Sequence, residues 1–180
     1  MKDMKIDKVL FSEAEIRECV RRLAGQIESD YAEGTELLCV GVLKGCFVFL
    51  ADIIRALSRD VTVNFMEVSS YGDSTVGGEL KILKDLTVDI KDRDVLIIED
   101  IIDSGRTISK LREELLSRKP ASLKLCAMFD KPARREVECD ADYIGLEVPD
   151  VFVVGYGLDY AEKYRNLPYL AEIKAEDREE

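Results

Sequence analysis

The chain of 180 residues contains no histidine. This absence excludes serine-hydrolase triads, imidazole general bases and histidine-ligated metal sites. Any proton transfer must therefore fall to an Asp, Glu, Lys, Tyr or Cys side chain. The five cysteines are odd in number and none is spaced as Cys-x-x-Cys, so we expect free, reduced and mostly structural thiols.

Long apolar runs are also missing. No stretch approaches the length of a membrane span and no charged-then-apolar leader opens the sequence, so we expect a cytoplasmic protein without a membrane partner. The net charge of −11 argues against a nucleic-acid partner and against an anionic membrane surface. Were so acidic a protein to bind an anion, it would be expected to enlist a hard cation such as Mg²⁺, held by carboxylates and by oxygens of the ligand.

Segments with strand-like and helix-like patterns alternate through the middle of the chain. This alternation predicts an α/β fold with a mainly parallel central sheet flanked by helices. The length fits one domain over residues 1–180, with a small hood formed by the N-terminal segment and roughly residues 130–170. The sequence contains no internal repeat and no low-complexity linker.

Hydrophobic periodicity places the individual elements. Strands are expected at residues 36–43, 61–68, 81–86, 95–98, 122–129, 143–146 and 152–154. Helices are expected from a Ser12-x-x-Glu15 capping box to near Gly34, at 47–57 and at 108–116. In the second strand, Val61, Val63 and Phe65 alternate with Thr62 and Asn64, which predicts one apolar and one polar face. Residues 69–79 hold three glycines and several hydroxyls, which predicts a loop that could serve as a lid.

The most informative segment is residues 95–107, Val-Leu-Ile-Ile-Glu-Asp-Ile-Ile-Asp-Ser-Gly-Arg-Thr. Its four leading aliphatic residues predict a strand that is buried on both faces. Because an unpaired carboxylate inside such a strand is too costly, Glu99 and Asp100 should lie at its carboxyl end. Open α/β sheets keep their ligand crevices at that edge.

The acids are followed by a group of small, hydroxyl-bearing and charged residues, Asp103, Ser104, Gly105, Arg106 and Thr107. A flexible glycine and two hydroxyls before a helix suit a phosphate monoester, which the free N–H groups of the helix start would bind. The alternative is a solvated acidic turn with a simple helix cap. The order of the polar residues favours the functional interpretation.

Three other segments carry polar or aromatic residues near strand ends. Leu43-Lys44-Gly45 stands between a strand and a helix and could hold a second anion, although a plain turn would look the same. Lys131 could donate to a carbonyl oxygen and Arg135 could form a bidentate contact with a pyrophosphate, although both could also be surface residues of a loop without a functional role. Phe152 could stack on a flat heterocycle or belong to the core, and Asp159 could bind a metal or its water.

Together these segments closely resemble the hypoxanthine-guanine phosphoribosyltransferases, over residues 10–168. The acidic strand-and-loop motif marks the wider type I phosphoribosyltransferase family, and no Walker A loop is present. Residues 43–45, 70–72, Lys131 and residues 154–160 narrow the resemblance to the 6-oxopurine branch. The resemblance implies Mg²⁺-dependent transfer of phosphoribose from phosphoribosyl diphosphate to N9 of hypoxanthine or guanine, by a homodimer or homotetramer.

The resemblance also implies roles for the acidic and phosphate-loop residues. Glu99 and Asp100 match an acid pair that holds the ribose hydroxyls and supports Mg²⁺. Asp159 matches a second Mg²⁺ contact, made directly or through water, and is also counted among the residues around the purine. Asp103 to Thr107 match the loop that wraps the 5′-phosphate, and Asp103 has the position of the base that takes a proton from purine N7.

The remaining residues match the purine, pyrophosphate and lid positions of the family. Lys131 matches a hydrogen bond to purine O6, Phe152 a ring that stacks on the base, and the Val153 backbone a contact to its exocyclic edge. The resemblance further implies a pyrophosphate loop at Lys44-Gly45, whose peptide bond is often cis in the family, a pyrophosphate contact at Arg135, and a lid at Ser70 and Tyr71.

Two alternatives stay open at this point. The first is another phosphoribosyltransferase, for which Lys131 argues against adenine as the acceptor but does not exclude xanthine. The second is a non-catalytic nucleotide sensor that binds RNA, which the net charge and the presence of Asp103 disfavour.

Overall fold

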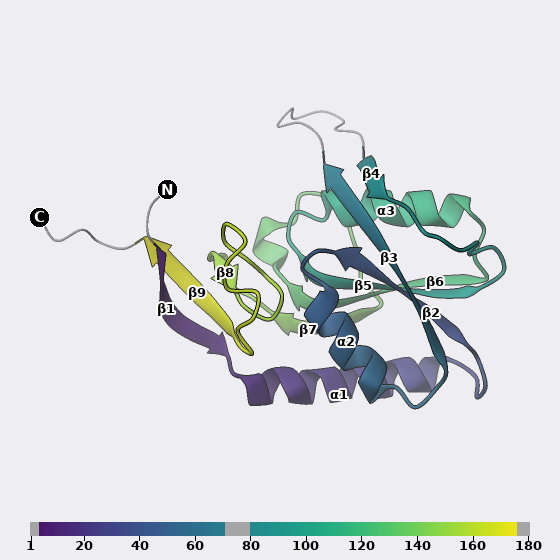
Figure 1. Ribbon diagram of the computed structural model, residues 1–180, viewed down its shortest axis with the longest axis horizontal. Helices are drawn as coiled ribbons and strands as arrows, with labels where there is room; N and C mark the ends of the chain where they lie inside the picture. The colour runs from purple at the N-terminus through teal and green to yellow at the C-terminus, as the bar shows by residue number, and fades with distance from the viewer. Residues whose placement is uncertain (1–3, 71–79, 176–180) are drawn as a thin grey trace, which may run out of the picture.

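The computed structural model describes residues 4–70 and 80–175 (Figure 1). Its central sheet has six strands in the order β4-β3-β2-β5-β6-β7. The strands are β2 (Leu37–Leu43), β3 (Val61–Ser70), β4 (Leu80–Lys84), β5 (Asp94–Ile102), β6 (Ser122–Asp130) and β7 (Tyr143–Glu147). All neighbouring pairs are parallel except β3 with β4. The expected mainly parallel α/β sheet is confirmed.

Helices cover both faces of this sheet. The helices are α1 (Glu13–Asp30), α2 (Phe47–Ala56) and α3 (Arg106–Ser117). Side chains of α1 and α2 pack with Cys39, Leu96 and Ile98 on one face, whereas those of α3 pack with Val40 and Ile97 on the other. Successive strand residues therefore enter opposite clusters, which explains why β2 and β5 are apolar at nearly every position rather than at every second one.

The first helix begins as expected and ends earlier. Ser12 and Glu15 form both bonds of the capping box. The helix stops at Asp30, not near Gly34, because Arg59 donates to the backbone carbonyl of Glu28 in its last turn and to that of Tyr31 just after it. An arginine from a different part of the chain thus satisfies carbonyls that a longer helix would have paired internally.

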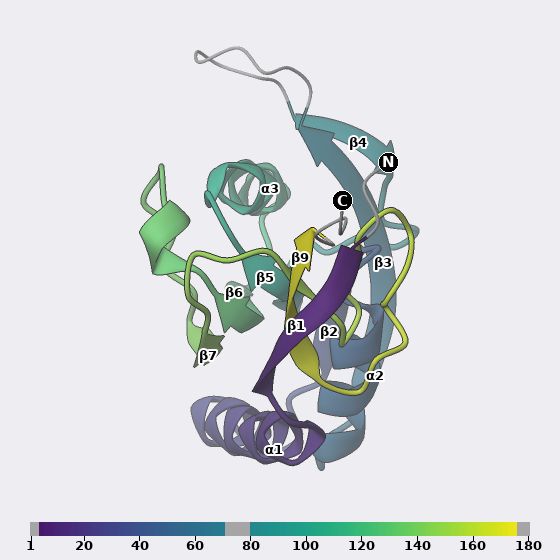
Figure 2. The ribbon, with the colours of Figure 1, turned by 90° about the vertical axis from the view of Figure 1, so that its left-hand side faces the viewer.

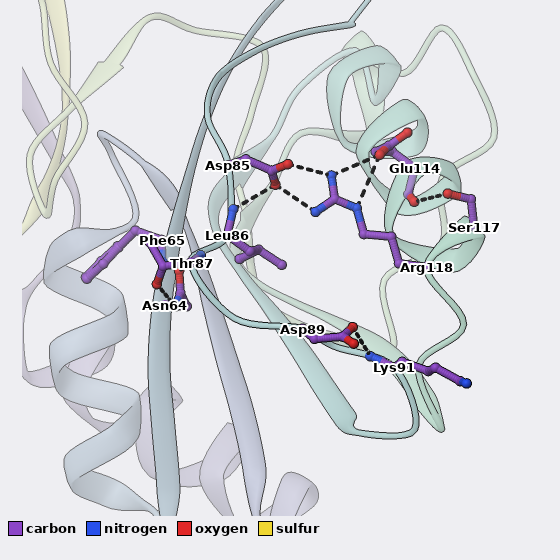
Figure 3. A network of polar contacts seen from close by, with 10 residues as sticks. All are labelled: Asn64, Phe65, Asp85, Leu86, Thr87, Asp89, Lys91, Glu114, Ser117 and Arg118. Atoms are coloured by element: carbon purple, nitrogen blue, oxygen red, sulfur yellow. Dashed lines mark hydrogen bonds and ion pairs between the residues drawn. The ribbon is translucent and has the colours of Figure 1, made fainter.

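The alternation expected within β3 is confirmed at Val61, Thr62 and Phe65 and is wrong at Val63 and Asn64. Asn64 is buried, at 9% exposure, whereas Val63 is 38% exposed. The Asn64 amide donates to the Thr87 hydroxyl at 2.8 Å and its oxygen accepts from the Thr87 backbone N–H (Figure 3). A buried amide costs little when it is hydrogen-bonded, so the loop between β4 and β5 makes this polar residue acceptable inside.

That same loop is tied to the end of α3 (Figure 3). Arg118 donates to both carboxylate oxygens of Asp85, at 2.7 and 3.0 Å, and to Glu114 within the helix. The bidentate pair holds the chain that leaves β4 against the C-terminal turn of α3.

A second, small sheet has the order β1-β9-β8 and contains β1 (Met4–Phe11), β8 (Val153–Val154) and β9 (Leu170–Ala175). Figure 2 shows β1 and β9 side by side, and their pairing is antiparallel. The sequence analysis expected no strand at either segment. β7, which falls in the range expected for the hood, is instead the edge strand of the central sheet. The division into one domain with a hood stays a prediction. Among the described helices, none combines the length and the apolar character of a membrane span.

The contact between β7 and β6 gives a test of packing. A Cβ added at Gly145 would lie 2.2 Å from the Met128 carbonyl oxygen, whereas one added at Gly25 in α1 would meet nothing within 4 Å. We expect Gly145→Ala to destabilise the protein by roughly 1–3 kcal/mol through overpacking. Gly25→Ala should stabilise it by about 0.5–1 kcal/mol, because alanine favours the helix. Urea denaturation measures both, and equal effects of the two substitutions would contradict the packing described here.

Candidate active site

The acidic pair lies where two strands of the central sheet stop pairing. β2 pairs with β5 only as far as Gly41 opposite Ile98, while β6 follows β5 up to Ile102. Glu99 and Asp100 therefore precede the last two residues of the strand, which is longer than expected because β6 continues beside it. They face a cleft of about 250 Å³ between the end of β2 and the start of α3. A larger groove of about 970 Å³, between α1, α2 and residues 156–168, contains none of the expected site residues.

Both carboxyl groups are poorly solvated. Burial, and next the charge of Asp100, raise the pKa of Glu99 well above its usual value. Burial also raises the pKa of Asp100, against the lowering effect of the Ile101 N–H and of Arg165. Within the described residues, Glu99 Oε2 is buried without a hydrogen-bond partner. An unpaired carboxylate oxygen beside a second acid provides acceptors for a cation or for hydroxyl groups.

Glycines bring the neighbouring loops into contact with this pair. A Cβ added at Gly45 would lie 1.5 Å from Asp100 Oδ2, and one added at Gly157 would lie 2.1 Å from the Gly45 carbonyl oxygen. The loop after β2 is thus packed between the acid and the loop that follows β8. The cis peptide bond found in the described chain joins Leu43 and Lys44, one bond earlier than the Lys44-Gly45 peptide considered above.

The expected phosphate loop forms a turn into α3. Gly105 is the N-cap residue and has a φ of 82°, a left-handed conformation that glycine adopts without strain. Ser104, Gly105 and Thr107 line the same cleft as the acidic pair, so the start of α3 lies at this cleft. Of the N–H groups in the first helical turn, that of Arg106 donates to the Ser104 hydroxyl at 3.4 Å. Arg106 turns away and pairs with Glu136.

The residues expected to contact a purine lie beside this cleft rather than in its lining. Lys131 is buried, donates its side-chain amine to the Val151 carbonyl at 2.9 Å, and donates its backbone N–H to Ile102 at the end of β5. Phe152 is 53% exposed and meets Tyr160 edge to face, with ring centroids 5.6 Å apart. Val153 follows in β8 and pairs with Glu172 of β9.

Three expected site residues are engaged with other parts of the protein. Arg135 donates to the Asp103 carbonyl at 2.6 Å and forms an ion pair with Asp130. Lys44 pairs with Glu162 at 3.0 Å. Asp159 pairs at 2.7 Å with Arg165, a residue that the sequence analysis missed because no motif marks it.

The residues expected at the metal site and at the lid differ in how far the structure places them. Within residues 4–70 and 80–175, no three acidic or cysteine side chains converge on a metal site, so Glu99, Asp100 and Asp159 do not form a ready cluster. Two carboxylates still fit Mg²⁺, which commonly takes its other ligands from substrate and water. Ser70 ends β3 opposite Leu80 of β4, whereas Tyr71 lies outside the described residues.

Comparisons with known proteins show which family this chain resembles. A model of the phosphoribosyl transferase domain matches residues 10–161. The chain is 52% identical over 170 residues to the hypoxanthine-guanine phosphoribosyltransferase of Bacillus subtilis (strain 168), with 94% of each protein covered. A crystal structure of a hypoxanthine-guanine phosphoribosyltransferase from Bacillus anthracis superposes with a TM-score of 0.89 at 46% identity, covering 96% of this chain and all of that one.

A third relative is longer. The chain is 53% identical over 172 residues to the bifunctional protein TilS/HprT of Listeria monocytogenes and spans only 26% of its length. The chain therefore belongs to the phosphoribosyltransferase family, in the group of the hypoxanthine-guanine phosphoribosyltransferases.

The elevated pKa of Glu99 predicts how stability depends on pH. A carboxyl whose pKa is higher in the folded than in the unfolded protein binds more protons when folded, so the free energy of unfolding falls as pH rises above about 4.5. Glu99→Gln removes this penalty. The metal-free variant should exceed the parent protein in stability by on the order of 1 kcal/mol at pH 8, and the gap should close toward pH 4. Urea denaturation in EDTA measures it, with Glu113→Gln on the exposed face of α3 as a control that shows no such trend. A gap that widens toward acid would contradict the burial of Glu99.

Proposed function

We propose that this chain is a purine-salvage enzyme that transfers the phosphoribosyl group from phosphoribosyl diphosphate to N9 of hypoxanthine or guanine. The products are the nucleoside monophosphate and pyrophosphate. The observation that carries the proposal is one cleft in which Glu99 and Asp100 face the glycine turn and the open N-terminus of α3. That combination binds a phosphate at one end and hydroxyl groups or a cation at the other. The names of the relatives support hypoxanthine or guanine as the acceptor of the phosphoribosyl group.

The sugar phosphate would occupy this cleft. Backbone N–H groups at the start of α3 and the hydroxyls of Ser104 and Thr107 would bind the 5′-phosphate. Glu99 and Asp100 would accept from the ribose hydroxyls and hold Mg²⁺, with Asp159 as a further contact. The cation would neutralise the pyrophosphate as it departs. The peptide groups at Lys44-Gly45 would hold that pyrophosphate, and Ser70 with Tyr71 would close over the sugar to exclude water.

The purine would lie beside the turn at Asp103. Lys131 would donate to purine O6 while it keeps its bond to the Val151 carbonyl, since an ammonium has three donors. Phe152, exposed on one side, offers a ring on which the base would stack, and the Val153 backbone would face its exocyclic edge. Asp103 would take the proton from N7 as the bond to N9 forms. The chain has no imidazole that could take this role.

We also propose that the protein is a cytoplasmic homodimer or homotetramer whose substrates are small molecules, with neither nucleic acid nor membrane as a partner. The acidic net charge supports the last point.

Initial rates test the reaction. With phosphoribosyl diphosphate and Mg²⁺, we expect turnover of hypoxanthine or guanine, none of adenine or uracil, and loss of activity in EDTA. Adenine is excluded because its 6-amino group would meet the Lys131 ammonium, donor against donor. Faster turnover of xanthine than of the other bases would leave the family assignment standing and would make xanthine the acceptor. A lack of turnover with every base, despite nucleotide binding, would favour the non-catalytic sensor.

Substitution of Asp103 tests the assignment of the base. Asp103→Asn should lower kcat by about 10²–10⁴-fold, because the amide cannot accept the N7 proton, while nucleotide binding measured by calorimetry survives. Asp60→Asn is the matched control, since the exposed Asp60 precedes β3 at the opposite edge of the sheet. Full turnover by Asp103→Asn would remove Asp103 from this role.

A further inference from the structure

The turn at Asp103 is held from outside by residues that follow Lys131. Arg135 Nη1 donates to the Asp103 carbonyl at 2.6 Å. The backbone N–H groups of Glu136 and Val137 both donate to the Ser104 carbonyl, at 3.0 and 3.3 Å. The chain at 135–137 therefore binds two successive carbonyls of the turn that carries the proposed base.

Arg135 is itself fixed in place. Its guanidinium forms an ion pair with Asp130, the last residue of β6, and the two side chains are only 19% and 13% exposed. A Cβ added at Gly105 would lie 3.1 Å from Arg135 Cδ, so the side chain also packs directly on the turn. A planar guanidinium that bonds to a carboxylate and a carbonyl together has little freedom to rotate away.

The carboxylate of Asp103 is held more loosely than its backbone. Among the described contacts its Oδ1 has no hydrogen bond, and the nearest cation is Arg134 Nε at 3.5 Å. Arg134 is 56% exposed and shared with Asp150, so its pull on the carboxylate is weak. The position of Asp103 is thus set through its main chain, which leaves the carboxylate available to a ligand.

Lys131 and Arg135 stand at the two ends of one short element, the 3₁₀ helix Pro132–Arg134. Its turns are closed by bonds from Arg134 N–H to the Lys131 carbonyl and from Arg135 N–H to the Pro132 carbonyl, at 3.0 and 3.1 Å. The Lys131 amine at one end donates to the Val151 carbonyl, and the Arg135 guanidinium at the other end donates to the Asp103 carbonyl. On a 6-oxopurine, O6 and N7 lie on the same edge, so a donor to O6 and an acceptor from N7 must keep a fixed spacing.

From this juxtaposition we infer that Arg135 is a positioning residue, which sets the distance between Asp103 and Lys131 and so fits the site to the O6/N7 edge of the purine. The inference rests on the proposed function, in which these two residues contact the base. It assigns Arg135 to the acceptor side of the reaction rather than to pyrophosphate.

A double-mutant cycle tests it. Arg135→Met should lower kcat for hypoxanthine by about 10–100-fold, with the KM for phosphoribosyl diphosphate within about threefold of the parent value. In an Asp103→Asn background the same substitution should change kcat by less than about threefold, because residues that act as a unit are not additive. Arg112→Met is the matched control: Arg112 binds the Asp140 carbonyl and Asp142, and it should leave turnover within about twofold.

Two outcomes would overturn the inference. An equal loss of kcat in both backgrounds would mean that Arg135 has only a structural role. A raised KM for phosphoribosyl diphosphate at unchanged kcat would mean that Arg135 contacts the pyrophosphate instead. If Arg135→Met leaves Asp130 unpaired and fails to fold, Arg135→Lys, which keeps the charge, replaces it in the cycle. An ammonium cannot reproduce the planar fork of the guanidinium. We therefore expect an intermediate loss of kcat that vanishes in the Asp103→Asn background. An inactive parent protein would instead refute the proposed function alone.

Discussion

The site depends on one structural constraint, the point at which β2 stops pairing with β5. Pairing ends at Ile98, directly before the two acids Glu99 and Asp100. β6 continues on the other side, so the acids stay on a rigid strand while one flank opens into the cleft. The close approach of Gly45 to Asp100, and of Gly157 to Gly45, follows from the need to pack loops around that opening without adding side chains.

The central sheet could be predicted because its signals are local. The apolar runs at β2, β5 and β6 report burial on both faces, and the capping box reports the start of α1. The errors arose where the partner is distant in sequence. Asn64 is buried through Thr87, α1 ends early through Arg59, and β1 is a strand only because β9 lies beside it. Its largely exposed side chains leave no apolar pattern to read.

The residues of the site likewise divide into those whose positions could be predicted from the sequence and those whose positions could not. The acids and the glycine turn form one continuous segment, so their arrangement at the start of α3 follows from the sequence. The positions and partners of the cationic side chains do not follow from the sequence. A lysine or arginine reaches far from its backbone, and its partner is set by the fold. Arg135 contacts the Asp103 carbonyl and the Asp130 carboxylate, two partners that the sequence did not indicate, and no motif marked Arg165 beside Asp159.

Exposure then separates the cations of this acidic protein into two kinds. The pair between Lys44 and Glu162 is more than half exposed on both sides and contributes little to stability, so an incoming anion can displace Glu162 at small cost. The pair between Arg135 and Asp130 is mostly buried, and separating it would leave an uncompensated charge inside the protein. A phosphate or pyrophosphate would therefore recruit cations of the first kind, while those of the second kind would keep the site in shape. The same argument accounts for how a chain with a net charge of −11 would bind the anionic substrate proposed above: Lys44 at the cleft is already held in an exposed ion pair, and it could exchange its carboxylate partner for the ligand.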